Sequence, residues 1–324
     1  MSKSHPLCQH TEKYGITSKL QELICLVGQD QVFEEGEHLL KALLGVDISA
    51  KQIQRVSEHY GSEIELQQAA YVEGSIEVPV LAVKQKEEPV YMMFDGGMVF
   101  TRQGWKEMKV GRIFKSSSCV AIQPNRNEIL RSMYVCHFGG HKEFLAKWEA
   151  YTAPYKHKIF IADGATWIWN WVTDCYPEAV QILDFFHAVE KIGTYAALQY
   201  SDAKIRSEWL EAQKVRLPNN EVDKIIEELK TTIARTAESD KARTEAIGYY
   251  ENNSTRMQYK TYLEKGYIIG SGAIESAHRN VIQQRLKLSG QRWSIPGAQQ
   301  IANLRAFSKS NQWGLVIDLI KKAA

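Results

Sequence analysis

The chain has 324 residues, 44% of them hydrophobic, which is enough to bury a sizeable core in one large domain with appendages or in two domains. Its formal net charge of +2 is close to neutral and by itself says nothing about nucleic acid. No run of about 18 apolar residues appears, and the N-terminus lacks the apolar stretch of a signal peptide, so we expect a cytoplasmic globular protein with no membrane partner. The five cysteines lie far apart with no C-x-x-C pair, which indicates neither a disulfide framework nor a zinc ribbon.

Residues 1–70 are predicted to form a helical region. The apolar spacing indicates helices in LQELICLVG, in VFEEGEHLLKALLG and in SAKQIQRVSEHYG, the last one capped by Ser49 and running towards His59. A helix, a tight glycine-containing connection and a second helix fit a helix-turn-helix that would bind DNA. Many helical hairpins without that role look the same, so both interpretations stay open. The polar side chains that the second helix would offer are Lys51, Gln52, Gln54 and Arg55.

Residues 75–200 are predicted to form the first part of a mixed sheet. The strand-like runs VPVLAV, VYMMFDGGMVF, VGRIFKSSSCVAI and RSMYVCHFGG indicate an antiparallel meander. After them, HKEFLAKWEAYTA reads as a helix, KHKIFIADGA as a buried strand, TWIWNWVTDCYP as a helix, AVQILDFFH as a strand and AVEKIGTYAALQY as a helix. Meandering strands followed by alternating helix and strand predict the α/β class.

The rest of the chain is predicted to be helical. Residues 201–265 are polar and charged with no strand candidate, which indicates an all-helical insertion. Residues 266–324 would return to the core with a Gly-Ser-Gly turn, a helix from Ala273 to about Leu288 and a final helix from about Ala298. This last stretch carries a surplus of six positive charges, which could meet phosphates or could belong to a solvated helix face.

Three carboxylates stand in settings that favour a metal site. Asp95 in VYMMFDGG lies within an apolar strand, where we expect it to be buried and to need a partner. Asp163 ends the apolar run IFIADGA in the same way, and glycine after each aspartate lets backbone or ligand approach closely. Glu275 in GSGAIES lies about one turn into a helix that Ser271 could cap. Taken singly, they could be two turn aspartates and a glutamate paired with Arg279, whereas together they suit hard divalent cations.

The order of FDGG, IADGATWIWNW, DFFH, GSGAIESAHRNVIQQRLKLSGQRWS and GAQQIANLRA resembles the DDE transposases of bacterial insertion sequences, and within them the ISKra group, which is related to the Mutator-like branch. The similarity covers nearly the whole chain, and GSGAIES and SGQRWS are its most specific blocks. It implies an RNase H-like core whose first and fourth strands are adjacent, which would bring Asp95 and Asp163 together, with Glu275 coming from a later helix. It also implies a DNA transposase in which these three residues hold two Mg²⁺ ions, or Mn²⁺ in their place, for strand cleavage and strand transfer.

The resemblance further implies partners and supporting residues. The partners would be the double-stranded DNA of the element ends and of the target, bound by a homo-oligomer associated with the nucleoid. The D-x-x-H pattern of the Mutator-like branch is matched by Asp184 and His187 in ILDFFH, which would support the active site. The alternative is a strand-end aspartate that caps the next helix, with a histidine in its first turn. Contacts with DNA are expected from Arg279, Arg285, Lys287, Arg292 and Trp293.

Two other functions fit the same residues. A nuclease of the RNase H fold would use the same carboxylates without joining DNA ends, and a truncated or domesticated derivative would bind DNA as a regulator. Similar transposases often begin with additional N-terminal sequence, at times with Cys-containing metal motifs, whereas this chain starts close to the helical region. A natural truncation, a split reading frame and a compact variant all stay open, as do the terminal repeats, the target preference, the fate of the non-transferred strand and the oligomeric state.

Overall fold

The computed structural model describes residues 14–82, 88–123 and 126–323, and these form two compact units. Unit 1 contains the described residues up to Lys156 and those from Ile274 onward, and unit 2 spans His157–Ala273. These bounds differ from those of the four stretches expected from the sequence. Unit 2 begins upstream of the expected helical insertion and contains two strands as well.

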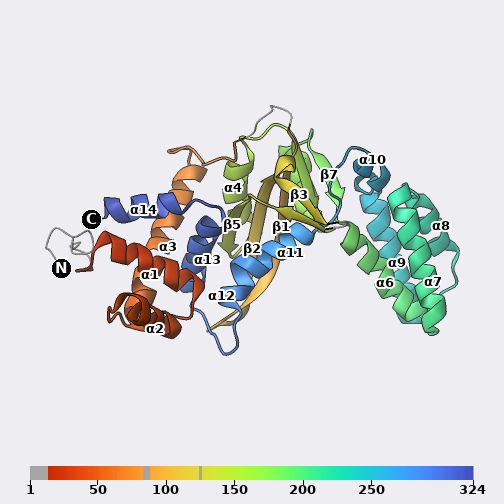
Figure 1. Ribbon diagram of the computed structural model, residues 1–324. Coiled ribbons are helices and arrows are strands. Elements are labelled where there is room, and N and C mark those ends of the chain that lie inside the picture. Colours follow the sequence, from red (N-terminus) through yellow and green to blue (C-terminus); the bar gives the residue numbers. More distant parts are fainter. Residues whose placement is uncertain (1–13, 83–87, 124–125, 324) are drawn as a thin grey trace. The chain divides into compact units, whose positions relative to one another are not determined.

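Unit 1 opens with three helices, α1 (Ser18–Asp30), α2 (Phe33–Leu44) and α3 (Ala50–Val72), labelled in Figure 1. The side chains of Thr17 and Ser49 cap α1 and α3, because each accepts a hydrogen bond from an amide of the first turn. The prediction that the third helix ends near His59 is wrong. The helix continues through Gly61, whose missing side chain lets α3 touch another helix: a Cβ there would lie 2.2 Å from the carbonyl oxygen of Gln300.

The sheet of unit 1 has three antiparallel strands, β1 (Val90–Thr101), β2 (Gly104–Lys115) and β5 (Met133–Phe138), with β2 paired to both others. In the β1–β2 hairpin, Asp95 lies opposite Val110. The strand predicted at VPVLAV is not formed by its described residues, 78–82. Pro79 explains this, because a proline has no amide hydrogen to donate to a strand ladder. The last residue of that run, Val83, lies outside the described residues.

Two helices flank this sheet. On one face, α4 (His141–Thr152) packs the rings of Phe144 and Trp148 against Phe94 of β1, at centroid distances of 5.4 and 5.6 Å. At the edge strand β5, Gln299 of α13 (Ile295–Lys309) accepts a hydrogen bond from the amide of Phe138 at 2.6 Å. The helix therefore pairs a backbone group that an edge strand would otherwise leave open.

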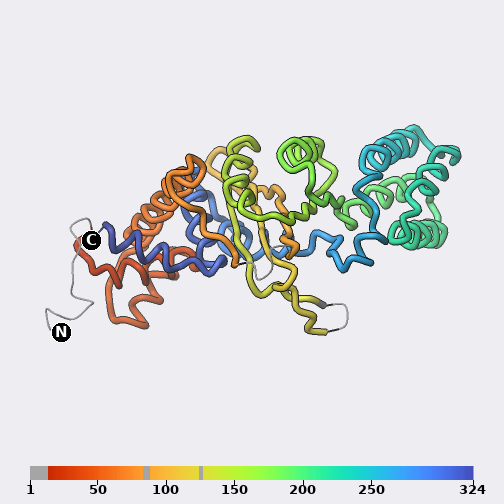
Figure 2. The backbone as a smooth tube through the Cα atoms, turned by 90° about the horizontal axis from the view of Figure 1, so that it is seen from above, coloured from red at the N-terminus to blue at the C-terminus, as the bar shows by residue number. Residues whose placement is uncertain are grey.

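The remaining elements of unit 1 are one short β-ribbon and the C-terminal helices. The ribbon is built from β3 (Cys119–Gln123) and β4 (Arg126–Ile129) and projects from its surroundings in Figure 2. The single helix predicted from Ala273 to about Leu288 is made of three consecutive pieces, and a last helix was not predicted. In order these are α11 (Gly272–Ala277), the π-helix η5 (His278–Gln283), α12 (Gln284–Leu286) and, after α13, α14 (Trp313–Lys322).

Unit 2 begins with a parallel strand pair, β6 (Lys158–Ala162) and β7 (Val180–Leu183), joined by α5 (Thr166–Cys175) and followed by α6 (Phe185–Gln199). Parallel neighbours need a crossover connection, and α5 supplies it. The strand predicted in AVQILDFFH is shorter than expected. It ends at Leu183, because Asp184 starts the next helix and the FFH residues form that helix's first turn.

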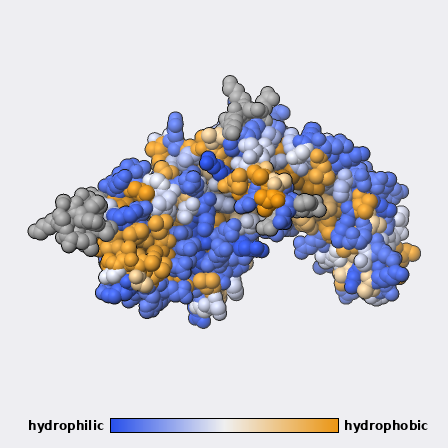
Figure 3. Space-filling model, viewed as in Figure 1, coloured by the Kyte–Doolittle hydropathy of each residue, from blue (hydrophilic) through white to orange (hydrophobic). Residues whose placement is uncertain are grey.

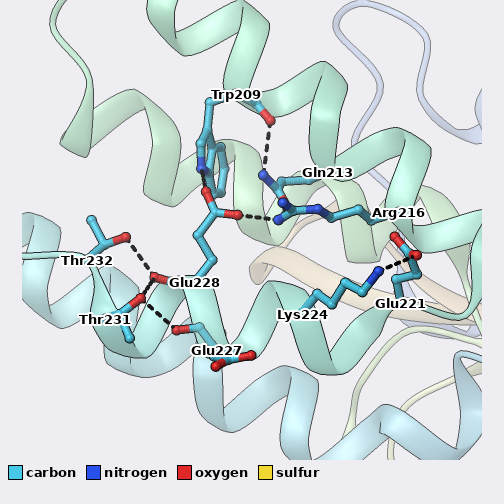
Figure 4. Close-up of polar contacts among 9 residues, drawn as sticks. All are labelled: Trp209, Gln213, Arg216, Glu221, Lys224, Glu227, Glu228, Thr231 and Thr232. Atoms are coloured by element: carbon cyan, nitrogen blue, oxygen red, sulfur yellow. Dashed lines mark hydrogen bonds and ion pairs between the residues drawn. The ribbon is translucent and has the colours of Figure 1, made fainter.

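The other helices of unit 2 are α7 (Ala203–Arg216), α8 (Val222–Thr231), α9 (Ala237–Asn253) and α10 (Tyr259–Glu264). Glu228 of α8 joins α7 to α8: its carboxylate accepts a hydrogen bond from the Trp209 indole at 2.6 Å and pairs with Arg216 (Figure 4). The structure describes every residue from 202 to 262, and none of them belongs to a strand.

Both units combine helices and strands, so the predicted α/β class is confirmed. Antiparallel pairing belongs to unit 1 and parallel pairing to unit 2. Within the residues that the structure describes, no helix has the length and apolar character needed to cross a membrane. Apolar surface gathers over α1 and α2 (Figure 3), where Leu43 of α2 is 71% exposed.

Candidate functional site

Asp95 stands where β1 emerges from the core. The preceding residues, Val90–Phe94, are buried, whereas the side chain of Asp95 is 45% exposed. The expectation that Asp95 is buried is therefore wrong, since its carboxylate marks the end of the apolar half of the strand. One carboxylate oxygen accepts a hydrogen bond from the amide of Gly96 at 2.7 Å. The other lies 3.6 Å from Nε2 of His278.

The two glycines after Asp95 leave room for neighbouring side chains. A Cβ at Gly97 would lie 2.8 Å from Nδ1 of the His278 ring, closer than real Cβ atoms come. A Cβ at Gly96 would lie 1.9 Å from a carboxylate oxygen of Glu107, but that side chain is 50% exposed and can move away. Gly97 is thus the position where the absent side chain matters, because it lets His278 pack on the β1 backbone beside Asp95.

Glu275 lies in the first turn of α11 with its side chain exposed. The neighbours Ile274 and Ala277 are buried, which turns the glutamate outward. Directly after this turn the helix widens into the π-helix that begins at His278. Such π-turns are rare and often occur at functional sites, so this local geometry singles out the segment.

A pocket of about 390 Å³ within unit 1 collects these side chains. Asp95 and Glu275 contribute carboxylates, and Arg279 and Lys287 contribute positive charge. Carboxylate oxygens are the ligands that Mg²⁺ prefers, and cationic side chains beside them suit a phosphate. Four of the residues expected from the sequence therefore share one cavity. Its lining consists of Asp95, Gly96, Gly97, Glu275, His278, Arg279, Ile282, Gln283 and Lys287.

His278 lines this pocket with a largely buried ring. Burial lowers its pKa below the ordinary value, the Asp95 carboxylate and backbone oppose that change, and Lys287 adds to it. Its Nε2 has no hydrogen-bond partner among the described residues, although Asp95 is 3.6 Å away. The imidazole therefore fills the space beside Asp95 and limits where the carboxylate can turn.

Asp163 directly follows β6 in unit 2. Its Oδ1 accepts a hydrogen bond from the amide of Ala165 at 3.0 Å, and its backbone carbonyl accepts one from the Trp169 indole at 2.8 Å. Trp169 is 3% exposed and belongs to the core of unit 2. Tyr249 covers Gly164 so closely that a Cβ there would lie 2.1 Å from its ring. The backbone around Asp163 is thus held on both sides, while the residue itself is half-buried.

Asp184 is fully buried, at 0% exposure, where β7 passes into α6. One carboxylate oxygen accepts a hydrogen bond from the amide of His187 at 2.9 Å and lies 2.5 Å from that ring's Nδ1. The other accepts a hydrogen bond from the amide of Ser271 at 2.6 Å. Asp184 therefore caps α6, as the alternative interpretation of the D-x-x-H pattern expects, and it also fixes the backbone just before α11.

Tyr249 lies beside both aspartates of unit 2. Burial raises its pKa above the ordinary value, and the nearby carboxylates of Asp163 and then Asp184 raise it further. Both aspartates follow the ends of the paired strands β6 and β7, so unit 2 brings Asp163, Asp184 and His187 to one edge of that pair. Within either unit, the described residues include no three His, Cys, Asp or Glu side chains placed to share one metal ion.

Two of the expected DNA contacts lie inside the protein. The guanidinium of Arg285, a residue 1% exposed, lies over the rings of Phe33 and Trp293 at 4.7 and 4.9 Å. Its Nε donates a hydrogen bond to the carbonyl of Gly28 at 3.2 Å. Burial and then Arg305 lower the pKa of Arg285 to about 10. Trp293 is itself 7% exposed, so neither side chain is available to a phosphate, and we drop both expected contacts.

Sequence reasoning missed three residues of interest. His278 had a signal, because it lies three positions after Glu275 and residues at that spacing are neighbours on a helix. Tyr249 had none, since its place beside the aspartates of unit 2 depends on how α9 packs. Trp105 of β2 is 59% exposed, and the polar residues around it in GWKEMKV could have indicated this.

Comparison with known proteins found no family model that matches this chain and no curated protein that matches its sequence. The resemblance of GSGAIES and SGQRWS to transposases stays an expectation.

Proposed function

We propose that this protein is a DNA transposase that uses two Mg²⁺ ions, for which Mn²⁺ can substitute, to cleave DNA strands and join them to a target. The proposal includes an RNase H-like arrangement, in which Asp163 would join Asp95 and Glu275 in one active site. The substrates would be double-stranded element ends and target DNA, bound in the cytoplasm by more than one copy of the chain.

The observation that supports the proposal most is the pocket of unit 1. Asp95 and Glu275 are separated by 180 positions in the sequence, yet both line one cavity together with Arg279 and Lys287. A surface ion pair would explain a carboxylate next to an arginine, but not two carboxylates with a glycine pair and a π-turn at the same place. Carboxylates that can hold metal ions, next to cations that can bind a phosphate, suit a phosphodiester substrate.

The residues present fit a hard divalent ion. Asp95 is 45% exposed and Glu275 is exposed, so their oxygens can reach a ligand in the pocket without unfolding the strand or the helix. Two carboxylates leave several coordination positions to water and phosphate, as Mg²⁺ prefers. The third carboxylate of the proposal, Asp163, belongs to the other unit and is half-buried beside a tyrosine.

Each side chain would have a separate task. Asp95 and Glu275 would hold the ions, while Arg279 and Lys287 would bind the oxygens of the DNA backbone. His278 would keep the Asp95 carboxylate in its place. When bound, Mg²⁺ supplies Lewis acidity that activates water or a 3′-OH and stabilises the leaving oxygen. Asp184, which caps α6 and accepts a hydrogen bond from the amide of Ser271, would position Asp163 and not touch the substrate.

The test uses the full chain and supercoiled plasmid that carries the DNA flanking its reading frame. Asp95→Asn, Asp163→Asn and Glu275→Gln should each abolish cleavage in Mg²⁺ with little change in DNA binding, because each removes a ligand charge at nearly constant volume. Asp318→Asn, at an exposed position of α14, is the matched control and should cleave normally. Cleavage by any of the first three variants at the normal rate would remove that residue from the site.

Analysis of the products separates the proposed function from its rivals. Joined ends in the wild-type reaction support a transposase. Nicks or breaks without joining would identify a nuclease, and binding without either product would identify a regulator. Wild-type protein that neither binds nor cuts the flanking DNA would overturn the proposal.

A further inference from the structure

We infer that the tip of the β1–β2 hairpin is a stacking site for one unpaired nucleotide, with Trp105 and Phe100 holding the base and Lys287 and Arg292 holding its phosphate. The inference rests on the proposed function, since it names the part of the DNA substrate that this surface binds. It concerns a cavity that shares Lys287 with the carboxylate pocket.

The hairpin presents its aromatic rings in a fixed arrangement. Phe100 and Trp105 are direct cross-strand partners, and their ring centroids lie 5.1 Å apart. The turn between them is closed by Thr101, whose hydroxyl donates a hydrogen bond to the carbonyl of Gly104 at 2.7 Å. A rigid aromatic surface binds a flat ligand at a lower entropic cost than a mobile one.

A second set of contacts ties the hairpin tip to the C-terminal loop. The amide of Trp293 donates a hydrogen bond to the carbonyl of Phe100 at 3.2 Å, and the amide of Arg102 donates one to the carbonyl of Trp293 at 2.9 Å. The loop from Lys287 to Arg292 is therefore held beside the two rings. This explains why residues far apart in the sequence line one cavity.

That cavity has about 330 Å³ and is lined by Phe100, Trp105 and residues 286–292. Its walls are mainly apolar, and the charged side chains among the lining residues are Lys287 and Arg292. Arg292 lies 5.7 Å from the centre of the Phe100 ring. A cavity that combines flat aromatic rings with cations, and has no carboxylate in its lining, suits a nucleobase and its phosphate. It does not suit a cationic ligand or a purely apolar one.

The exposure of Trp105 needs an explanation of its own. Trp105 is 59% exposed, which leaves much of a large apolar ring in water. The ring of Phe100 beside it is half-buried. The nearest acid on the strand, Glu107, is paired with Lys109 at 2.8 Å, so the surface keeps its positive character. Lys287 lines both this cavity and the carboxylate pocket, so a nucleotide stacked here would lie next to the backbone phosphate at the proposed site of cleavage.

The test measures binding of a fluorescein-labelled dT 12-mer to the full chain by anisotropy, in EDTA so that no cleavage occurs. Trp105→Ala should weaken binding by about 5- to 100-fold, which is the effect of losing one stacked base. Trp105→Phe should restore most of the affinity. Phe186→Ala removes an equally exposed aromatic ring, 58% exposed, in unit 2 and should leave the affinity unchanged.

Replacing all the nucleotides of the 12-mer by abasic sites gives an independent readout. Wild-type protein should lose affinity for an abasic oligonucleotide, whereas Trp105→Ala should bind abasic and intact oligonucleotides equally. Equal affinity of the wild type and Trp105→Ala for the intact 12-mer would overturn the inference. So would a self-association of the protein, seen by sedimentation without DNA, that Trp105→Ala abolishes, because the ring would then belong to an interface between copies. This assay measures binding alone and does not depend on the carboxylate variants or on cleavage, so the two proposals can fail separately.

Discussion

Replacing the two glycines that follow Asp95 by alanine should have different consequences, although they are neighbours in one strand. A methyl group at Gly97 would lie 2.8 Å from Nδ1 and 2.9 Å from Cε1 of His278, whose residue is 7% exposed. Ordinary contacts begin at 3.4 Å, so the ring must move by about half an ångström or more. At Gly96 the methyl group would meet only the end of the half-exposed Glu107 side chain.

These contacts set the expected magnitudes. Forcing extra volume into a packed site costs about 1–3 kcal/mol, and Gly→Ala in a strand recovers about 0.5–1 kcal/mol. Gly97→Ala should therefore lower the free energy of unfolding of unit 1 by roughly 1–2 kcal/mol. Gly96→Ala loses at most a half-exposed ion pair between Glu107 and Lys109, worth under about 1 kcal/mol, so its net effect should be near zero.

Urea unfolding followed by circular dichroism measures the stability of both variants, and the plasmid assay measures their cleavage. We expect Gly97→Ala to cleave more slowly than Gly96→Ala, because displacing the His278 ring also releases the Asp95 carboxylate beside it. Equal stability and equal cleavage of the two variants would refute the reasoning. It would mean that His278 is not packed on the β1 backbone at this point.

Three further expectations follow from particular contacts. Gly61→Ala should destabilise unit 1 by about 2 kcal/mol or more in urea unfolding, since its methyl group would meet the backbone of α13, whereas Gly314→Ala, with open space at its Cβ, should be neutral or slightly stabilising. Arg285→Ala should lower stability by about 2–4 kcal/mol without changing the salt dependence of DNA binding. Lys287→Ala should leave stability unchanged and reduce the slope of log K against log salt by about 1. Burial lowers the pKa of His137 to about 4, so the folded protein takes up this proton less readily than the unfolded chain, and stability should fall as the pH drops from about 6.5 towards 4; His137→Gln should flatten this part of the urea-midpoint profile.

Local sequence signals predicted which segments form elements better than where the elements end. Apolar strand runs became β1, β2, β5, β6 and β7, and Ser49 caps its helix as expected. The helix that Ser49 caps, by contrast, was expected to run only towards His59, and it continues through Gly61, although a glycine is costly inside a helix. Gly61 is kept within α3 by the close passage of α13, and that contact depends on a segment about 240 positions later in the chain.

The candidate site could also be predicted only in part, because some of its features depend on contacts between distant segments. The aspartate followed by two glycines in β1 indicated a close approach, and the approaching group is the ring of His278. The sequence could not show that Asp95 emerges from the core, because burial along a strand depends on how far the covering helices reach. The π-turn after Glu275 was equally hidden, since the buried residues along this segment keep the spacing of an ordinary helix.

The basic residues near the C-terminus show that the position of a residue on its helix decides whether its charge can contact DNA. Ile274, His278, Val281, Ile282 and Arg285 are all buried, and their spacing of three or four positions is that of one helix stripe. Arg285 therefore falls on the inner face by periodicity alone. Arg305 is also buried, at 0% exposure, but the residues of α13 from Ile301 to Phe307 are all buried, so periodicity does not mark its position.

Because these two arginines are buried, they do not count among the residues of the C-terminal segment that can contact phosphates. The exposed cations that line the two adjacent pockets are Arg279, Lys287 and Arg292. Each phosphate contact adds about 0.9 to the slope of log K against log salt for duplex DNA, so the triple alanine variant should differ from the wild type by roughly 3. A difference near zero would mean that DNA binds elsewhere on the protein. Replacing Arg285 and Arg305 by alanine instead should leave the slope at its wild-type value, because these side chains pack against Phe33 and Asp30 and do not reach phosphates.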